Sequence, residues 1–221
     1  MQVSIVIPTF REAEGIARAV ARARAIGDEV IVSDGGSDDG TVGAARDAGA
    51  IIVEGARGRG PQLHAGALRA SGDVLLFLHA DAELGPGARA AIARALADPD
   101  VAGGNFELRF VPVSFAARLF GWANNVRRRF GIYYGDSGIF LRAAIYAELG
   151  GFRALPILED YELVRRLERR YRTTYVRTPQ IEASARRFER APVRTLLRWT
   201  SIQLLYSIFG ASPERLARLY R

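Results

Sequence analysis

The sequence predicts an α/β fold in which helices cover both faces of a doubly wound, mostly parallel sheet. The prediction rests on three apolar runs that each end in polar residues, at 3–10, 29–34 and 73–81. Near-continuous runs of Val, Ile and Leu are typical of parallel strands that are buried on both faces. Segments of helical composition separate the runs, and such short crossovers require parallel neighbours and a right-handed wind. With 221 residues, 49% of them hydrophobic, the chain is long enough to fill one sizeable core.

Strands and helices alternate along the first 96 residues. After the first strand, segment 12–25 has helical composition, with Ile16, Ala19, Val20 and Ala23 on one apolar stripe. A glycine-rich turn follows the second strand. The remaining predicted elements are a helix at 41–48, a strand at 50–54, a helix at 62–70, a strand at 74–78 and a helix at 86–96. The carboxyl ends of the four strands are therefore expected at one edge of the sheet.

The composition narrows the classes of function. The formal net charge is +7, yet all 31 basic residues are Arg and none is Lys. Because genome composition accounts for this uniform choice more simply than a nucleic-acid interface does, no nucleic-acid partner is predicted. The absence of Cys excludes disulfides and thiol chemistry. The first strand begins within three residues of Met1, which leaves no room for a signal peptide and predicts a cytoplasmic protein.

Polar groups at the strand ends are expected to line one crevice, because ligands of open α/β sheets bind beyond the carboxyl ends of the strands. Pro8 and Thr9 end the first strand, Glu12 lies close behind them, and Asp34 ends the second strand. The other members are Arg59 and Gly60 in a Gly-Arg-Gly loop, and His79, Ala80 and Asp81 after the fourth strand. A single Asp at a strand end is often only a helix N-cap, so the combination carries the prediction.

This combination resembles the family 2 glycosyltransferases with the GT-A fold. The motifs are strand-Pro-Thr-Phe-x-Glu, strand-Ser-Asp-Gly-Gly-Ser-x-Asp-Gly-Thr, Gly-Arg-Gly before a helix, and Phe-Leu-His-Ala-Asp. The resemblance spans about residues 1 to 175 and implies that these positions bind a nucleotide-diphospho-sugar, with UDP ahead of GDP. Asp34 and the backbone of Pro8 and Thr9 can bind the edge of the base, while Glu12 reaches the ribose or base. Arg59, on its glycine-flanked loop, brings positive charge and backbone to the diphosphate.

The family's Asp-x-Asp motif reads His79-Ala80-Asp81 in this chain. The resemblance implies that Asp81 contacts a divalent metal, Mn²⁺ or Mg²⁺, which also binds the diphosphate oxygens. His79 replaces a carboxylate, and a neutral imidazole either donates to a ribose hydroxyl or ligates Mn²⁺. The alternative is that His79 is an ordinary residue at the end of a strand, with its hydrogen bonds satisfied by neighbouring protein groups. The other histidine, His64, is expected on a helix face near the phosphate crevice, without a catalytic role.

The second half of the chain is expected to supply the acceptor side. Gly135 and Asp136 precede a predicted strand at 139–141, and Glu159-Asp160 follows a Gly-Gly-Phe motif and begins an arginine-rich helix. The resemblance implies that Glu159 and Asp160 are both catalytic. Asp160 is the expected base, because sugar transfer needs a carboxylate opposite the leaving diphosphate to take the acceptor proton. Acidic residues also favour the first turn of a helix, and both roles can hold together. Asp136 either touches the acceptor or sugar, or caps a turn.

Four parts of the chain lie outside these motifs. Segment 110–130 mixes aromatic residues with Arg127-Arg128-Arg129, as in an amphipathic helix beside the acceptor crevice or an ordinary packed helix. Segment 192–209 is predicted to form a helix. Arg194 and Arg198 interrupt its apolar residues, so it lacks the ~20 mostly uncharged residues that a membrane span needs. It packs on the catalytic domain, forms a homodimer, or lies on a membrane surface, in that order of expectation. Arg186 or Arg187 is expected to clamp the diphosphate, and a short final helix begins near Ser212.

The sequence therefore predicts a GT-A domain at 1–180, with a donor half at 1–100 and an acceptor half at 101–180, and a helical extension at 181–221. The predicted function is metal-dependent, inverting transfer of a sugar to a small-molecule or lipid-linked acceptor. A sugar nucleotidyltransferase is the first alternative, disfavoured because the N-terminal turn lacks a long Gly-rich loop ending in Lys. A non-catalytic nucleotide-sugar-binding protein is the second, suggested by His79. Contact with the inner face of a membrane stays open.

Overall fold

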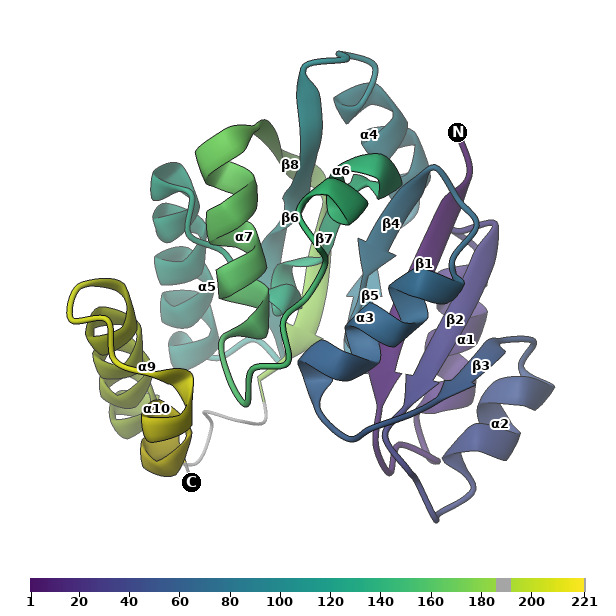
Figure 1. The fold of residues 1–221 in the computed structure, drawn as a ribbon, viewed down its shortest axis with the longest axis horizontal. Helices are drawn as coiled ribbons and strands as arrows, with labels where there is room; N and C mark the ends of the chain where they lie inside the picture. The colour runs from purple at the N-terminus through teal and green to yellow at the C-terminus, as the bar shows by residue number, and fades with distance from the viewer. Residues whose placement is uncertain (186–191, 221) are drawn as a thin grey trace.

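The computed structural model describes residues 1–185 and 192–220, and its strands form one eight-stranded sheet (Figure 1). The strand order in this sheet is β3-β2-β1-β4-β7-β6-β8-β5. The strands are β1 (Val3–Thr9), β2 (Glu29–Asp34), β3 (Ile51–Glu54), β4 (Val74–Phe77), β5 (Ala82–Leu84), β6 (Val101–Val111), β7 (Ile139–Arg142) and β8 (Arg172–Ser184).

The first half of the chain has the predicted alternation. β1 pairs in parallel with β2 and β4, and β2 pairs in parallel with β3. The helices between these strands and after β5 are α1 (Ile16–Arg24), α2 (Thr41–Asp47), α3 (Arg59–Arg69) and α4 (Ala88–Ala95). α1 begins four residues later than the segment predicted from residue 12, because the Glu12 carbonyl accepts the N–H groups of Gly15 and Ile16 in a turn that leads into the helix.

Helices cover both faces of the sheet, as the apolar strands predict. Side chains of β1 alternate, so that Ile5 and Ile7 join one apolar cluster with α1, α4 and α5 (Phe115–Arg127). Val6 joins the opposite cluster with α3, α6 (Ala143–Glu148) and α7 (Glu159–Arg170). Figure 1 shows α3, α6 and α7 together on one face. The doubly wound α/β fold is confirmed, and it presents the carboxyl ends of β1, β2 and β4 at one edge.

The second half of the sheet is mixed rather than parallel. β7, which contains the predicted strand at 139–141, runs antiparallel to both β4 and β6, and β6 pairs in parallel with β8. β5, β6 and β8 were not expected from the sequence. β6 contains Gly103 and Gly104, which weaken a strand signal. A Cβ at Gly104 would lie 2.2 Å from the Thr174 carbonyl oxygen, so glycine permits the close pairing of β6 with β8. β8 runs past residue 180, the predicted end of the catalytic domain.

Of the C-terminal helices, α9 (Pro192–Ser207) packs beside α5 and α7, and α10 (Pro213–Tyr220) packs against α9 (Figure 1). Trp199 of α9 meets Phe120 of α5 edge to face, with ring centroids 5.7 Å apart. The Tyr161 and Ser207 hydroxyls lie 3.0 Å apart and join α7 to the end of α9. Packing on the catalytic domain is therefore the arrangement in this structure. Among the described residues, none of the helices has the length and apolar character that a membrane crossing requires.

Candidate active site

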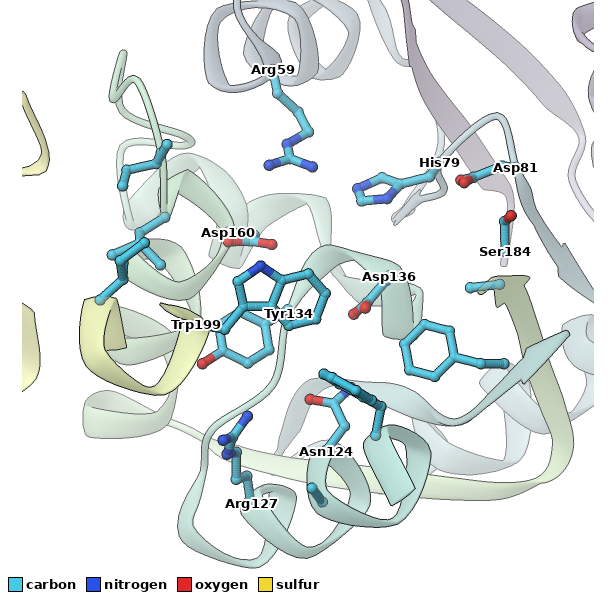
Figure 2. A pocket seen from close by; sticks show the side chains of 17 residues that line it. Arg59, His79, Asp81, Asn124, Arg127, Tyr134, Asp136, Asp160, Ser184 and Trp199 are labelled. Carbon is cyan, nitrogen blue, oxygen red and sulfur yellow. The ribbon is translucent and has the colours of Figure 1, made fainter. Parts of the chain in front are cut away.

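Side chains from both halves of the chain surround a cavity of about 150 Å³ at the carboxyl edge of the sheet (Figure 2). Polar groups come from the start of α3, from the turn between β4 and β5, from the 3-10 helix η2 (Gly135–Ser137), and from the start of α7. They are Arg59, His79, Asp81, Asp136 and Asp160. The facing wall is mainly apolar and contains Phe110, Phe120, Trp199 and Ile202, with Asn124 and Arg127 of α5 at its border. The cavity thus has a charged side and a hydrophobic side.

Asp160 is a buried carboxylate with a fixed orientation, 7% exposed. Its Oδ2 accepts the Gly135 N–H at 2.7 Å, and its Oδ1 accepts the Tyr161 N–H at 2.7 Å. Leu158, at the N-cap of α7, has a left-handed backbone with φ of 62°, which costs a leucine about 1–2 kcal/mol. This turn brings the first residues of α7 to the cavity. The carboxylate that the sequence predicts as the base therefore lies on the cavity wall.

Glu159 lies behind the cavity wall, where it is 1% exposed and forms an ion pair with Arg59. Burial raises the pKa of Glu159, the nearby charge of Asp160 raises it further, and Arg59 opposes both effects. Of the acidic pair, only Asp160 lines the cavity. The Arg59 guanidinium is thus held from behind by a carboxylate while it faces the cavity (Figure 2). The geometry gives Glu159 a positioning role toward Arg59, in place of direct contact with a reactant.

Gly135 separates His79 from Asp160. A Cβ at this glycine would lie 2.8 Å from His79 Nε2 and 3.2 Å from Asp160 Oδ2. The two functional groups therefore approach the same backbone position, and a side chain there would displace at least one of them. Figure 2 shows the His79 ring directed into the cavity that Asp160 borders. The structure thus brings together Gly135, His79 and Asp160, which the sequence places on the two separate halves.

Asp81 and Asp136 also face the cavity. Asp81 is exposed on the turn between β4 and β5, Ala80 is half-buried against the core, and Asp136 is half-buried in η2. Within residues 1–185 and 192–220, no group of three His, Cys, Asp or Glu side chains is close enough together to hold a metal ion. Asp81 with His79 is therefore an incomplete donor set. It fits Mn²⁺ or Mg²⁺ when oxygens of a diphosphate and water complete the coordination, as hard cations prefer.

Asp34 organises the loop after β2. Its Oδ1 accepts the Thr9 hydroxyl at 3.2 Å, and its Oδ2 accepts the N–H groups of Gly36 at 2.8 Å and Ser37 at 2.6 Å. The turn-capping role that a lone Asp often has is therefore present here. The predicted contact between Asp34 and a base stays a prediction, because in this structure its oxygens bind the protein's own loop.

Gln62 connects the three segments that meet at the end of the edge where the sequence predicts the nucleotide. Its amide nitrogen donates to the carbonyl oxygens of Thr9 at 2.6 Å and Ser33 at 2.9 Å, and its oxygen accepts the Gly58 N–H at 3.2 Å. The side chain is 6% exposed. Sequence reasoning missed this residue, since a Gln near the start of a predicted helix gives no signal of a buried cross-link. Gln62 fixes the β1 and β2 ends relative to the loop before α3.

The other predicted residues occupy supporting positions. Pro8 is half-buried at the end of β1, and Glu12 is exposed and donates its N–H to the Thr41 hydroxyl at 2.8 Å. Gly60 is buried, and a Cβ there would lie 2.4 Å from the Arg153 carbonyl oxygen. His64 lies on α3, with Nδ1 3.0 Å from the Tyr146 hydroxyl oxygen. It packs on the loop that carries the Gly-Gly-Phe motif. Arg186 and Arg187 are outside the described residues.

The cavity residues that were absent from the sequence prediction of the site include Arg127, Tyr134 and Trp199. Burial raises the pKa of Tyr134 well above its ordinary value, so its phenol stays protonated. Arg127 donates from Nη2 to the Thr200 hydroxyl at 3.3 Å and connects α5 to α9. Tyr134 directly precedes the predicted Gly135-Asp136 pair, and this position was the sequence signal that could have identified it as a site residue. The position of Trp199 depends on how α9 folds back, and no local pattern encodes that.

Comparisons with known proteins identify the family. Residues 4–146 match the description Glycosyl transferase family 2. No curated protein matches the chain. TarS from S. aureus superimposes with a TM-score of 0.64 at 15% identity, over 100% of this chain and 42% of TarS. TarS 1–349 in complex with UDP-GlcNAc gives 0.64 at 16% identity, over 99% of this chain and 70% of that one.

Glucosyl-3-phosphoglycerate synthase from Mycobacterium tuberculosis, in complex with Mn²⁺, UDP-glucose and phosphoglyceric acid, has a similar fold. It superimposes with a TM-score of 0.60 at 19% identity, over 89% of this chain and 77% of the synthase. At such identities the likeness establishes the fold, whereas the family match extends over well over half of the sequence. The chain therefore belongs to glycosyl transferase family 2 and is a glycosyltransferase with the GT-A fold of these structures.

Proposed function

We propose that this protein transfers a sugar from a nucleotide-diphospho-sugar to an acceptor hydroxyl, with inversion at the anomeric carbon. The observation that carries the proposal is the position of Asp160, a buried carboxylate that shares one cavity with Arg59, His79 and Asp81. A single in-line displacement at the anomeric carbon needs a base on the acceptor side and cationic or metal-binding groups on the side of the leaving diphosphate. The cavity offers both. Family membership also disfavours the alternative of a sugar nucleotidyltransferase.

The donor diphosphate is assigned to the side of the cavity formed by Arg59 and the turn between β4 and β5. Arg59 begins α3, an eleven-residue helix, so the helix N-terminus adds to the attraction for an anion. Asp81, with His79 beside it, would hold Mn²⁺ or Mg²⁺. When bound, the metal neutralises negative charge on the departing diphosphate. UDP is the nucleotide proposed first, because TarS and the mycobacterial synthase were both solved with UDP-sugars.

Asp160 is assigned as the general base. As the acceptor oxygen forms its bond to the anomeric carbon, Asp160 takes the hydroxyl proton, and the bond to the diphosphate oxygen breaks with its electron pair leaving on the diphosphate. The N–H groups of Gly135 and Tyr161 keep the carboxylate oriented. The apolar wall excludes water from the side opposite the charged groups, which favours a bound acceptor over hydrolysis.

The experiment compares donor binding and donor turnover in two variants. Calorimetry would measure UDP and GDP binding with and without Mn²⁺, and release of the nucleotide from the sugar would measure turnover. For Asp160→Asn we expect unchanged binding and a loss of turnover of about 100-fold or more, the usual contribution of a general base. For Asp81→Ala we expect the Mn²⁺-dependent gain in affinity to disappear. Turnover at the wild-type rate in Asp160→Asn would overturn the base assignment, and metal-dependent binding in Asp81→Ala would overturn the metal assignment.

A further inference from the structure

The surface formed by α5, the 3-10 helix η1 (Arg128–Phe130) and α9 exposes an unusual set of large apolar side chains. We call it the α5–α9 face and define it by Phe115, Trp122, Phe130, Leu197, Leu204 and Ile208. Phe115 is 84% exposed, Phe130 76%, Ile208 69% and Trp122 64%. Single exposed apolar residues are ordinary on protein surfaces, whereas a concentration of them on two neighbouring helices marks an interaction site.

The exposed residues follow helical periodicity. On α5, Phe115, Leu119 and Trp122 are spaced by four and three residues, so they form one stripe, while Phe120 faces the core. On α9, Leu197 and Leu204 are seven residues apart, and Ile208 follows four residues later, so the stripe continues just past the helix end at Ser207. Each helix therefore has two apolar sides, of which only one is covered by the protein.

The two stripes border the same contact between helices. Arg127 of α5 donates to Thr200 of α9, which lies three residues after Leu197 and four before Leu204. The core-facing contact between Phe120 and Trp199 lies on the inner side of the two helices. Figure 1 places α5 and α9 at the same end of the molecule, far from β3 and α2. Both helices thus expose an apolar stripe at this end of the molecule.

The charged residues of α5, η1 and α9 are all arginines. Segments 115–130 and 192–209 contain six arginines and no Asp or Glu. Of these, Arg118, Arg129 and Arg194 are exposed. A groove of about 670 Å³ borders Trp122 on the other side of α5. Its lining includes Arg118, Arg129 and Arg177, together with Glu107 and with Arg109, which forms an ion pair with Glu182. Exposed aromatic and aliphatic residues with flanking arginines are the composition of helices that lie in a membrane interface.

We propose that the α5–α9 face binds the surface of an anionic lipid membrane, with α5 and α9 lying in the interface. A second copy of the chain is the less favourable occupant, because a two-fold contact would oppose the arginines of one copy to those of the other with no acidic partners in either segment. Anionic headgroups instead attract the arginines near the surface, while the apolar side chains enter the headgroup region.

Membrane binding also bears on the acceptor, a step that rests on the proposed function. The inner sides of the same two helices supply Phe120 and Trp199 to the apolar wall of the active-site cavity. An acceptor with an apolar tail would therefore approach Asp160 from the membrane side, with its tail on this wall. Of the small-molecule and lipid-linked acceptors left open by the sequence, the lipid-linked class fits this arrangement.

Vesicle co-sedimentation tests the proposal without reference to activity. The full chain would be mixed with vesicles of phosphatidylcholine alone and of phosphatidylcholine with phosphatidylglycerol. We expect binding to the anionic vesicles, weakened by salt, and a loss of about tenfold or more in the double variant Phe115→Ser/Leu197→Ser. The matched control is Leu68→Ser on α3, whose side chain is 73% exposed and lies outside the face. It should bind as the wild type does.

Fluorescence gives a second readout that does not require the double variant to fold. Trp122 should be quenched by brominated lipid, and Trp122→Phe should lose most of that quenching, because the other tryptophan, Trp199, lies in the cavity wall. Equal binding to neutral and anionic vesicles, equal loss in Leu68→Ser, or a stable dimer in which Trp122 is shielded would each overturn the proposal. Membrane binding with no glycosyl transfer would leave the surface assigned and remove only the lipid-linked acceptor.

Discussion

At the scale of single residues, Gly135 sets the spacing on which the proposed chemistry depends. Replacing it with alanine would place a Cβ 2.8 Å from His79 Nε2 and 3.2 Å from Asp160 Oδ2. We expect Gly135→Ala to reduce sugar transfer or donor hydrolysis by about tenfold to 100-fold, since a displacement of about 1 Å in a catalytic group has an effect of this size. Nucleotide release from the donor sugar would measure it.

The matched control for this substitution is Gly43→Ala. Gly43 lies within α2, and a Cβ there would have nothing within 4 Å. The control variant should keep full activity and gain about 0.5–1 kcal/mol in the free energy of unfolding, because alanine favours a helix interior. If Gly135→Ala turned over as fast as Gly43→Ala, the close approach of His79 and Asp160 would have no catalytic importance.

Residue types predicted which side chains face the cavity where the proposed chemistry requires one particular group at a strand or helix end. Asp160, Asp81 and Arg59 face the cavity for this reason. The roles of Glu159 and Gln62 could not be predicted, because each depends on a contact between segments far apart in the sequence. A carboxylate beside Asp160 could equally have faced the cavity, and only the position of α3 against α7 sends Glu159 toward Arg59.

At the scale of elements, the carboxyl ends of β1 and β2 depend on Gln62. Replacing it with alanine would leave the carbonyl oxygens of Thr9 and Ser33 without its amide donor, and Gly58 without its acceptor. We expect Gln62→Ala to lower the free energy of unfolding by about 1–3 kcal/mol, the cost of leaving buried polar groups unsatisfied. The substitution should also weaken nucleotide binding, because the hydrogen bonds that hold three segments together at that edge are lost.

Urea denaturation and calorimetry would measure these two effects. Gln180→Ala is the control, since Gln180 is exposed on β8 and its replacement should change stability by less than about 0.5 kcal/mol. A Gln62→Ala variant as stable as this control would mean that water replaces the lost hydrogen bonds. Unchanged nucleotide affinity at reduced stability would confine Gln62 to a structural role.

Elements were predictable where one type of periodicity dominates the segment. The buried strand β4 is wholly apolar, β1 and β2 contain the apolar runs Ile-Val-Ile and Val-Ile-Val, and α1 has a single apolar stripe. β6 begins with small residues, and β8 mixes exposed, half-buried and buried positions without a continuous apolar run. These two strands pair with each other in parallel, for example at Asn105 and Tyr175, and α5 packs on β6. Both sets of contacts stabilise the strands. Such long-range pairing has no signature in a short window of sequence.

At the scale of the whole molecule, the cavity is closed by a helix from the far end of the chain. Trp199 and Ile202 of α9 complete the apolar wall opposite Arg59 and Asp81. If this wall excludes water, its removal should let water compete with the acceptor for the donor sugar. We expect Trp199→Ala to raise donor hydrolysis without acceptor severalfold, while nucleotide affinity changes little because the charged side of the cavity is untouched.

Trp122→Ala is the matched control for that prediction, because Trp122 is exposed on α5 and does not line the cavity. In buffer without vesicles it should hydrolyse the donor at the wild-type rate. Loss of the contact between Trp199 and Phe120 also loosens α9, so circular dichroism would establish that Trp199→Ala remains folded at the assay temperature. Hydrolysis that fails to rise in a folded Trp199→Ala protein would mean that the β-sheet half alone shields the donor. A rise would make the C-terminal helix part of the catalytic unit, since it then determines whether the sugar reaches an acceptor or water.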